Sequence, residues 1–150
     1  MKTQTKIITK KAIGKNKKGE VVEFEMSSTG FIYCPDNQLT ELILPKGCKV
    51  VSCYNNQLTE LILPDGCKKV YCHNNQLTEL IIPDGCEYAS CHNNQLTELI
   101  LPDGCEYVDC RNNQIKELHI PNSVKYLWCD DEVILTGDMN PEIEIDLFIK

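Results

Sequence analysis

The string CHNNQLTELI occupies Cys72–Ile81 and occurs again, letter for letter, at Cys91–Ile100. The two copies are related by a 19-residue step, and the same step links cysteines along most of the chain. One column of cysteines with this step consists of Cys34, Cys53, Cys72, Cys91, Cys110 and Cys129. A second column consists of Cys48, Cys67, Cys86 and Cys105. We therefore interpret the string as one copy of a repeated structural unit rather than as a duplicated site.

Asparagine and proline follow the same 19-residue step, without insertion or deletion. The asparagine column consists of Asn37, Asn56, Asn75, Asn94 and Asn113. The proline column consists of Pro45, Pro64, Pro83, Pro102 and Pro121. A site duplicated for its chemistry would not need its prolines and leucines copied in register, whereas a stacking unit would. The spacing therefore predicts coils of chain that stack on one another.

A single unit, CKKVYCHNNQLTELIIPDG (Cys67–Gly85), contains two segments with the alternation of a β-strand. The first segment, residues 70–73, and the second, residues 80–82, each place apolar side chains at every second position. The sequence Pro-Asp-Gly at residues 83–85 is typical of a turn, and the polar run at residues 73–76 forms the other corner. Each unit is therefore expected to be one flat coil with two short strands.

The apolar and asparagine positions of the unit follow the pattern L-x-x-L-x-L-x-x-N-x-L. The matching residues are Cys67, Val70, Cys72, Asn75 and Leu77. With Cys and Val in place of Leu, the chain here resembles the leucine-rich repeat family, and most closely its short, nested, cysteine-containing repeats of bacterial and viral type. The resemblance covers about residues 29–134. It implies a right-handed solenoid in which Asn75 and its equivalents lie inside and bind backbone groups of neighbouring coils.

We expect an all-β fold, a right-handed parallel β-solenoid of leucine-rich-repeat type with two short strands per 19-residue coil and a cap at each end. A single coil buries too little to offset the about 1.5 kcal/mol that ordering each residue costs, so the coils must stack. Residues 1–28 are expected to form an N-terminal β-hairpin cap. Residues 29–134 would be the solenoid of about six coils, and residues 135–150 a C-terminal capping strand.

The adjacent Cys and His of the repeated string suggest catalysis, but the strand period argues against it. Neighbouring side chains of a strand point to opposite faces, so an inward Cys72 and an outward His73 cannot form a nucleophile–base pair. Asp109 and Asp130 could be drawn as an acid/base pair, but no oxyanion donor or phosphate-binding glycine loop accompanies them in the sequence. We therefore predict that the protein is not an enzyme, and we assign no catalytic residue.

Metal binding is the second alternative for the cysteines and histidines. Zinc prefers four converging ligands, usually from close C-x-x-C pairs, whereas these cysteines form parallel rows. We expect the cysteines to act as small apolar residues of the core. A metal or a pH response at His73 and His92, and a row of calcium ions along a glutamate column, stay open as alternatives. No metal or other cofactor is predicted.

The charge is divided unevenly along the 150-residue chain. Residues 1–20 contain seven Lys and one Glu, which gives +6, so the overall charge of −7 leaves −13 for residues 21–150. The basic segment is short and lacks aromatic residues, so we expect a solvated hairpin and no contact with nucleic acid. No apolar run approaches the about 20 residues that span a bilayer, and we recognise no secretory signal. We therefore expect a cytoplasmic protein with reduced cysteines and no membrane partner.

Function is expected on the outward face of the first strand segments, because these positions vary from coil to coil. All six Tyr and the only Trp of the sequence are expected on this face. The predicted partner-binding residues are Tyr71, Tyr88, Tyr107, Tyr126, Trp128, His73, His92 and Arg111. Tyr, Trp and Arg are the usual anchors of protein interfaces, so we predict recognition of a protein partner through this face. Packing of the rings for sheet stability is the alternative.

The second strand segments present a different outward surface. An apolar stripe is expected from Ile43, Ile62, Ile81 and Ile100. Beside it runs a column of like charges, Glu41, Glu60, Glu79, Glu98 and Glu117. The stripe is an alternative interface, through which a structural or self-assembling protein would form a homodimer. Isoleucine retained only for its preference for strands would explain the stripe without a partner.

Overall fold

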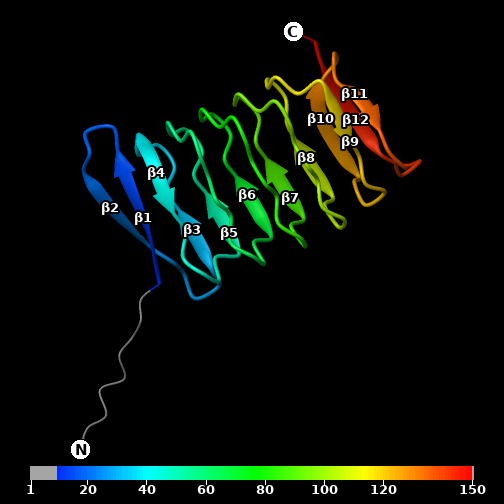
Figure 1. Ribbon diagram of the computed structural model, residues 1–150. Coiled ribbons are helices and arrows are strands. Elements are labelled where there is room, and N and C mark those ends of the chain that lie inside the picture. The colour runs from blue at the N-terminus through cyan, green and yellow to red at the C-terminus, as the bar shows by residue number, and fades with distance from the viewer. Residues whose placement is uncertain (1–9, 150) are drawn as a thin grey trace, which may run out of the picture.

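The computed structural model describes residues 10–149, which form strands and turns and contain no helix. No helix in this part of the chain could therefore cross a membrane. The strands follow one another in a row from the N-terminal to the C-terminal end, with chain looping around between them (Figure 1). Neighbouring strands keep the 19-residue step over most of the row, as in the pairing of Val50 with Lys69. The predicted fold class, an all-β solenoid of stacked coils, is confirmed.

A parallel seven-stranded sheet within residues 10–149 forms the first side of the solenoid. Its strands, in spatial order, are β12 (Glu144–Phe148), β10 (Tyr126–Asp130), β8 (Tyr107–Asp109), β7 (Tyr88–Ser90), β6 (Lys69–Tyr71), β5 (Val50–Ser52) and β3 (Phe31–Tyr33). The register places Val51 opposite Val70 and Val70 opposite Ala89, so the columns of the sequence are also columns in space.

The second side of the solenoid has no continuous sheet. Its strands are β4 (Leu39–Ile43), β9 (Glu117–His119) and β11 (Ile134–Thr136). Between β4 and β9 the described backbone forms one isolated bridge, from Ile81 to Ile100. The expectation of two strands in every coil is therefore wrong for the middle coils. Proline ends each second segment without an N–H to donate, and the glutamate column would place like charges opposite one another in a ladder, so both features oppose pairing here.

The two ends of the solenoid are built differently. At the N-terminal end, β1 (Lys11–Asn16) and β2 (Val21–Glu25) form an antiparallel hairpin, and β1 also pairs with β4. Phe24 and Met26 of this end pack against the core. At the C-terminal end, β12 joins the first sheet in parallel beside β10. Residues 1–9 of the expected N-terminal cap lie outside the described part of the chain.

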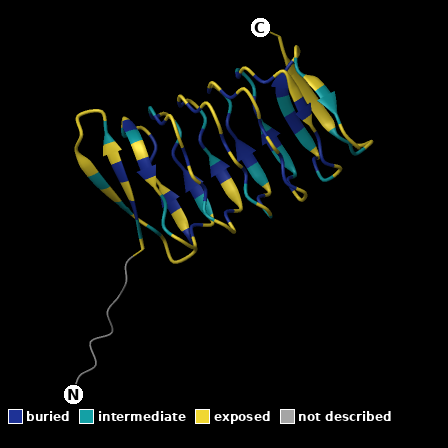
Figure 2. Cartoon of the chain, viewed as in Figure 1, coloured by how far each residue is buried: buried dark blue, intermediate teal, exposed yellow. Residues whose placement is uncertain are grey.

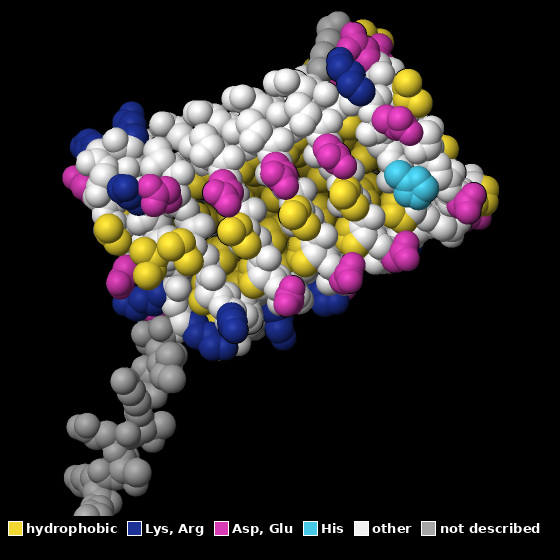
Figure 3. All heavy atoms as spheres, viewed as in Figure 1, with side chains coloured by type: hydrophobic (Ala, Val, Ile, Leu, Met, Phe, Trp, Pro, Cys, Tyr) yellow, Lys and Arg dark blue, Asp and Glu magenta, His cyan; other side chains and the backbone are white. Residues whose placement is uncertain are grey.

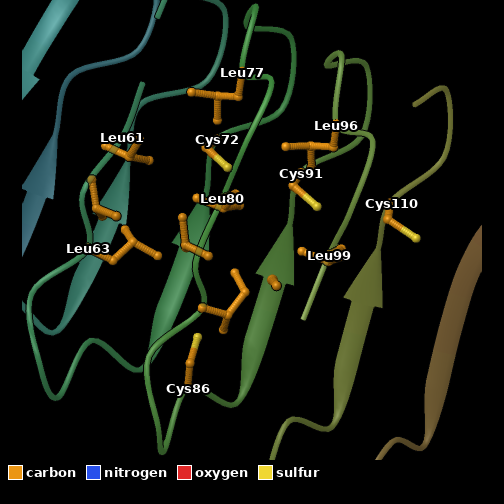
Figure 4. Close-up of a cluster of buried hydrophobic side chains, with 14 of the residues drawn as sticks. Leu61, Leu63, Cys72, Leu77, Leu80, Cys86, Cys91, Leu96, Leu99 and Cys110 are labelled. Carbon is orange, nitrogen blue, oxygen red and sulfur yellow. The ribbon is translucent and has the colours of Figure 1, made fainter. Parts of the chain in front are cut away.

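The core lies between the two sides and is filled column by column. Val70, Cys72 and Leu77 are fully buried, and Leu80 is 3% exposed. The leucines and cysteines of successive coils point into one interior (Figure 4). In several strands, such as β3 and β6, buried positions alternate with more exposed ones (Figure 2). All ten cysteines are buried free thiols, as expected of small apolar core residues.

Buried asparagines join the two sides at one corner of four successive coils. The Nδ2 of Asn94 donates hydrogen bonds to the carbonyl oxygens of Cys72 (3.1 Å) and Cys91 (2.9 Å) on the first side. Its Oδ1 accepts a hydrogen bond from the N–H of Leu77 (3.0 Å) at the start of the second side. Asn75 makes the equivalent bonds one coil earlier. The expected internal asparagine ladder is confirmed.

A second, exposed asparagine ladder was not expected. Asn55, Asn74, Asn93 and Asn112 adopt left-handed backbone conformations, with φ between 53° and 55°. Asn tolerates this region better than most residues, which explains why the corner sequence is Asn-Asn. The Nδ2 of Asn93 donates to the Oδ1 of Asn74 at 2.6 Å, and Asn74 donates likewise to Asn55 at 2.6 Å. The first member of each Asn-Asn pair thus links coils on the outside, and the second links them on the inside.

Candidate protein-binding face

Aromatic rings stack along the outward face of the seven-stranded sheet. The sheet register sets Tyr88 beside Tyr107 and Tyr107 beside Tyr126. Their ring centroids are 5.8 Å and 4.9 Å apart. Tyr71 continues the row at 4.9 Å from Tyr88, and Trp128 lies 6.2 Å from Tyr126. We call these five residues the tyrosine stack.

Every ring of the tyrosine stack is half-buried, although all five side chains point outward. Each ring covers part of the face of its neighbours, so the stack presents mainly ring edges and polar tips. Aromatic pairs at such distances contribute about 0.5–1.5 kcal/mol each beyond their buried area. The stack therefore stabilises the sheet and also forms a rigid amphipathic surface.

A second row of rings runs beside the tyrosine stack. The ring of Tyr54 lies 4.7 Å from that of His73 with a 5° interplanar angle, and His73 lies 4.4 Å from His92 at 11°. We call these three residues the imidazole stack. The Nδ1 of His73 is within hydrogen-bond distance of the hydroxyl of Ser90, at 3.2 Å. The hydroxyl of Tyr54 lies 3.3 Å from that of Tyr33, which ties the row to the first coil.

Asp109 fixes the residue that follows the imidazole stack. The Nε and one terminal nitrogen of Arg111 donate to the two carboxylate oxygens of Asp109 at 2.9 Å and 2.7 Å. The same carboxylate lies 3.9 Å from the Nε2 of His92. Two-point pairing holds a guanidinium in a defined plane. Arg111 is therefore a fixed part of this face.

Burial sets the protonation of the imidazole stack. It lowers the pKa of His73, and the neighbouring His92 lowers it further, while Asp109 raises it. Burial also lowers the pKa of His92, against the opposing effect of Asp109. Burial, Tyr71 and Asp109 raise the pKa of the Tyr88 hydroxyl. His73, His92 and Tyr88 are therefore held in their uncharged forms at neutral pH.

Small side chains leave a hollow at the N-terminal part of the same face. In β5 the outward positions are Val50 and Ser52, where neighbouring strands carry rings. The hollow has a volume of about 540 Å³. It is lined by Thr29, Phe31, Val50, Ser52, Tyr54, Lys69 and Tyr71. Three of the lining residues, Phe31, Tyr54 and Tyr71, are aromatic, and Tyr71 is also the first ring of the tyrosine stack.

The structure places the eight predicted partner-binding residues on one face. The tyrosine stack holds five of them, and His73, His92 and Arg111 follow one another in the adjacent row. The prediction omitted Tyr54, Asp109 and the hollow. Tyr54 precedes His73 by one 19-residue step, so the column spacing already indicated it. The roles of Asp109 and of the hollow depend on side-chain directions, which spacing does not give.

The isoleucine stripe, predicted as the alternative interface, is exposed on the second side. Ile43, Ile62, Ile81 and Ile100 are 67%, 73%, 69% and 65% exposed. Acidic side chains lie on both sides of this apolar stripe (Figure 3). A groove of about 950 Å³ between two coils is lined by both kinds of residue, including Ile62, Ile81, Glu60, Glu79, Asp65 and Asp84.

The cysteines and aspartates considered above as catalytic or metal-binding residues are instead buried in the core or hydrogen-bonded within the fold. Burial raises the pKa of Cys91 to about 12, and it raises the pKa of Cys72 well above the usual value for a thiol. Cys72 is fully buried, whereas the ring of His73 stacks outside the sheet. The Asp130 carboxylate accepts hydrogen bonds from the backbone N–H of Asn112 at 2.8 Å, while that of Asp109 binds Arg111. Within residues 10–149, no three His, Cys, Asp or Glu side chains converge as metal ligands would.

The fold and this face define the chain as a β-solenoid with a cluster of aromatic residues on one face. Comparison with protein-family models, with curated proteins and with solved structures gave no match. Membership of the leucine-rich repeat family therefore stays a prediction from the repeat pattern.

Proposed function

We propose that the protein is a non-enzymatic recognition protein of leucine-rich-repeat type that binds another protein. The binding surface is the face of the first sheet that carries the tyrosine stack, the imidazole stack and the hollow, which we call the aromatic face. The observation that carries the proposal is the hollow next to a row of fixed rings. Interface hot spots are typically Tyr, Trp or Arg side chains that lie in well-packed pockets from which water is excluded.

The charge of the chain supports a protein partner over a nucleic acid. Residues 21–150 carry a net charge of −13, which would repel a phosphate backbone. Fixed rings lose little conformational entropy on binding, so the stacks favour association. The free buried thiols support a reducing compartment, for which we propose the cytoplasm.

Two variants of the aromatic face test the proposal by separate routes. Val50→Arg fills the hollow, and a combined Tyr88→Ala, Tyr107→Ala and Trp128→Ala variant removes most of the tyrosine stack. The control variant combines Ile62→Lys, Ile81→Lys and Ile100→Lys on the second side. We expect wild type and control to retain the same protein from a lysate of the native cell. Each aromatic-face variant should lose it, because a hot-spot residue contributes about 2 kcal/mol or more.

Circular dichroism of each variant shows whether its fold is intact before binding is compared. A partner that both aromatic-face variants retain at wild-type affinity would refute the assignment. Loss of the partner with Val50→Arg alone would limit the binding surface to the hollow.

A second candidate function is self-assembly through the isoleucine stripe of the second side. The exposure of Ile43, Ile62, Ile81 and Ile100, at 65–73%, favours an interface there. The acidic residues on both sides of the stripe oppose pairing with an identical acidic surface. A homodimer that the isoleucine control variant converts to a monomer would support this candidate. It would also show that the aromatic face does not form the dimer interface.

A further inference from the structure

The C-terminal end of the solenoid leaves core positions uncovered. Ile145 and Leu147 of β12 pair in register with Leu127 and Cys129 of β10, which are both fully buried. They therefore belong to the inward columns of the sheet. Nevertheless, Ile145 is 39% exposed and Leu147 is 50% exposed. In the first coil, by contrast, Ile32 of β3 in the same column as Leu127 has no exposed surface.

The free edge of β12 also carries backbone groups in position to pair. Within residues 10–149, β12 has β10 as its single neighbour in the sheet. The N–H of Glu144 donates to Lys125 at 2.8 Å, and the carbonyl of Phe148 accepts from Asp131 at 3.1 Å, so these residues turn their backbone groups inward to the sheet. Backbone groups alternate in direction along a strand. Those of Ile145 and Leu147 therefore point to the free edge.

We propose that a second copy of this chain covers this end, by antiparallel pairing of β12 with its equivalent about a two-fold axis. The axis passes between the Leu147 residues of the two copies. Leu147 then pairs with Leu147 of the other copy, and Ile145 pairs with Ile149. These are the residues whose backbone groups face the free edge, so each pair exchanges two backbone hydrogen bonds. The inward faces of the two sheets coincide, and the apolar side chains of both copies complete one core.

The acidic residues of β12 select this register. With the axis at Leu147, Asp146 faces Phe148 of the other copy. An axis one residue earlier sets Asp146 against Asp146, and an axis at Ile145 sets Glu144 against Asp146. Like charges directly opposite each other in a ladder are destabilising. A two-fold contact is also self-limiting, because pairing uses the free edge of β12 in both copies.

The first test measures the mass of the full chain by sedimentation velocity over a range of concentrations. Wild type should change from a monomer of 17.1 kDa to a species of twice that mass. Leu147→Lys places two like charges on the axis and should raise the dissociation constant at least about tenfold, which corresponds to 1.4 kcal/mol. Val21→Lys is the matched control, since Val21 is 69% exposed on the edge strand β2, and it should leave the dimer unchanged.

A second variant separates the interface from the fold. Leu147→Pro removes an N–H at the free edge and none of the bonds to β10, so it should give a folded monomer. Asp146→Asn should change the dissociation constant less than about threefold, because it loses no opposite charge in this register. A wild-type chain that stays monomeric would overturn the proposal. So would open-ended oligomers, or a dimer that survives Leu147→Lys but is lost with the isoleucine variant of the second side.

Discussion

The two sides of each coil come from the same 19-residue repeat but differ in bonding and in surface. On the first side, seven strands pair without interruption, and the outward positions carry stacked rings. On the second side, the middle coils share one isolated bridge, and the outward positions carry isoleucine and glutamate. The first side therefore joins successive coils to one another, while the second side closes each coil over the core.

The sequences of the two sides differ in the same way. The second-side string Leu-Thr-Glu-Leu-Ile occurs unchanged in four coils, starting at residues 39, 58, 77 and 96. The outward positions of the first side change in almost every coil, from Val50 and Ser52 to Tyr107 and Asp109. Repeats that are constant on one side and variable on the other indicate that the variable side carries the specific information. This contrast supports the proposal that the aromatic face is the binding surface.

The largest effect is expected from removing a buried asparagine that is hydrogen-bonded to both sides. Asn94→Ala removes the hydrogen bonds that Asn94 donates to the carbonyls of Cys72 and Cys91 on the first side, and the one that it accepts from the N–H of Leu77 on the second. The N–H of Leu77 is then left unpaired at a cost of about 1–3 kcal/mol, whereas the carbonyls of Cys72 and Cys91 keep hydrogen bonds from Asn75 and Asn113. Together with the two lost hydrogen bonds, we expect the free energy of unfolding in urea to fall by at least about 2 kcal/mol. Asn93→Gly, which keeps the left-handed backbone and loses only exposed bonds, should cost less than half as much, and equal losses would contradict the division into inner and outer ladders.

A smaller effect compares the two outward surfaces directly. Tyr107 contacts a ring on each side, so Tyr107→Ala should lower the free energy of unfolding by about 1–3 kcal/mol. Ile81 is 69% exposed, and Ile81→Ala should change it by less than about 0.5 kcal/mol. Urea midpoints of the two variants measure the difference. A larger loss of unfolding free energy for Ile81→Ala would show that the second side contributes more to the stability of the solenoid than its bonding indicates.

The smallest expected effect is a pH dependence confined to the first side. The pKa values of His73 and His92 are lowered by burial, so the folded state binds fewer protons than the unfolded state just below pH 6.5. The free energy of unfolding should therefore have its full value above about pH 6.5. It should decrease as the pH falls from there toward the lowered pKa values of the two histidines. Urea titrations at pH 7.5 and 5.5 should show this decrease in wild type. A combined His73→Gln and His92→Gln variant should show less of it, and an unchanged slope would exclude the imidazole stack as its source.

The sequence predicted the columns of this molecule better than the contacts between them. The 19-residue step placed Val70 and Cys72 inside and Ile81 outside, and the structure agrees. The step alone did not reveal that the second segments of the middle coils share only one isolated bridge, because pairing depends on proline and on the charges of neighbouring coils. It also missed the left-handed corner residue Asn74, whose conformation follows from the path of the chain between the two sides. Which rings stack depends on side-chain rotamers, so the stacking of Tyr54 on His73 appeared only with the structure.

The exposed asparagine ladder gives the solenoid a row of aligned side-chain dipoles. The amides of Asn112, Asn93, Asn74 and Asn55 each donate toward the preceding coil, and the last donates to the carboxylate of Asp36 at 3.0 Å. Aligned amides add their dipoles, as peptide groups do along a helix, so the positive end of this row lies at the first coil. The carboxylate of Asp36 stands at that positive end and neutralises it. The row thus behaves as a helix macrodipole built from side chains, with its own anionic cap.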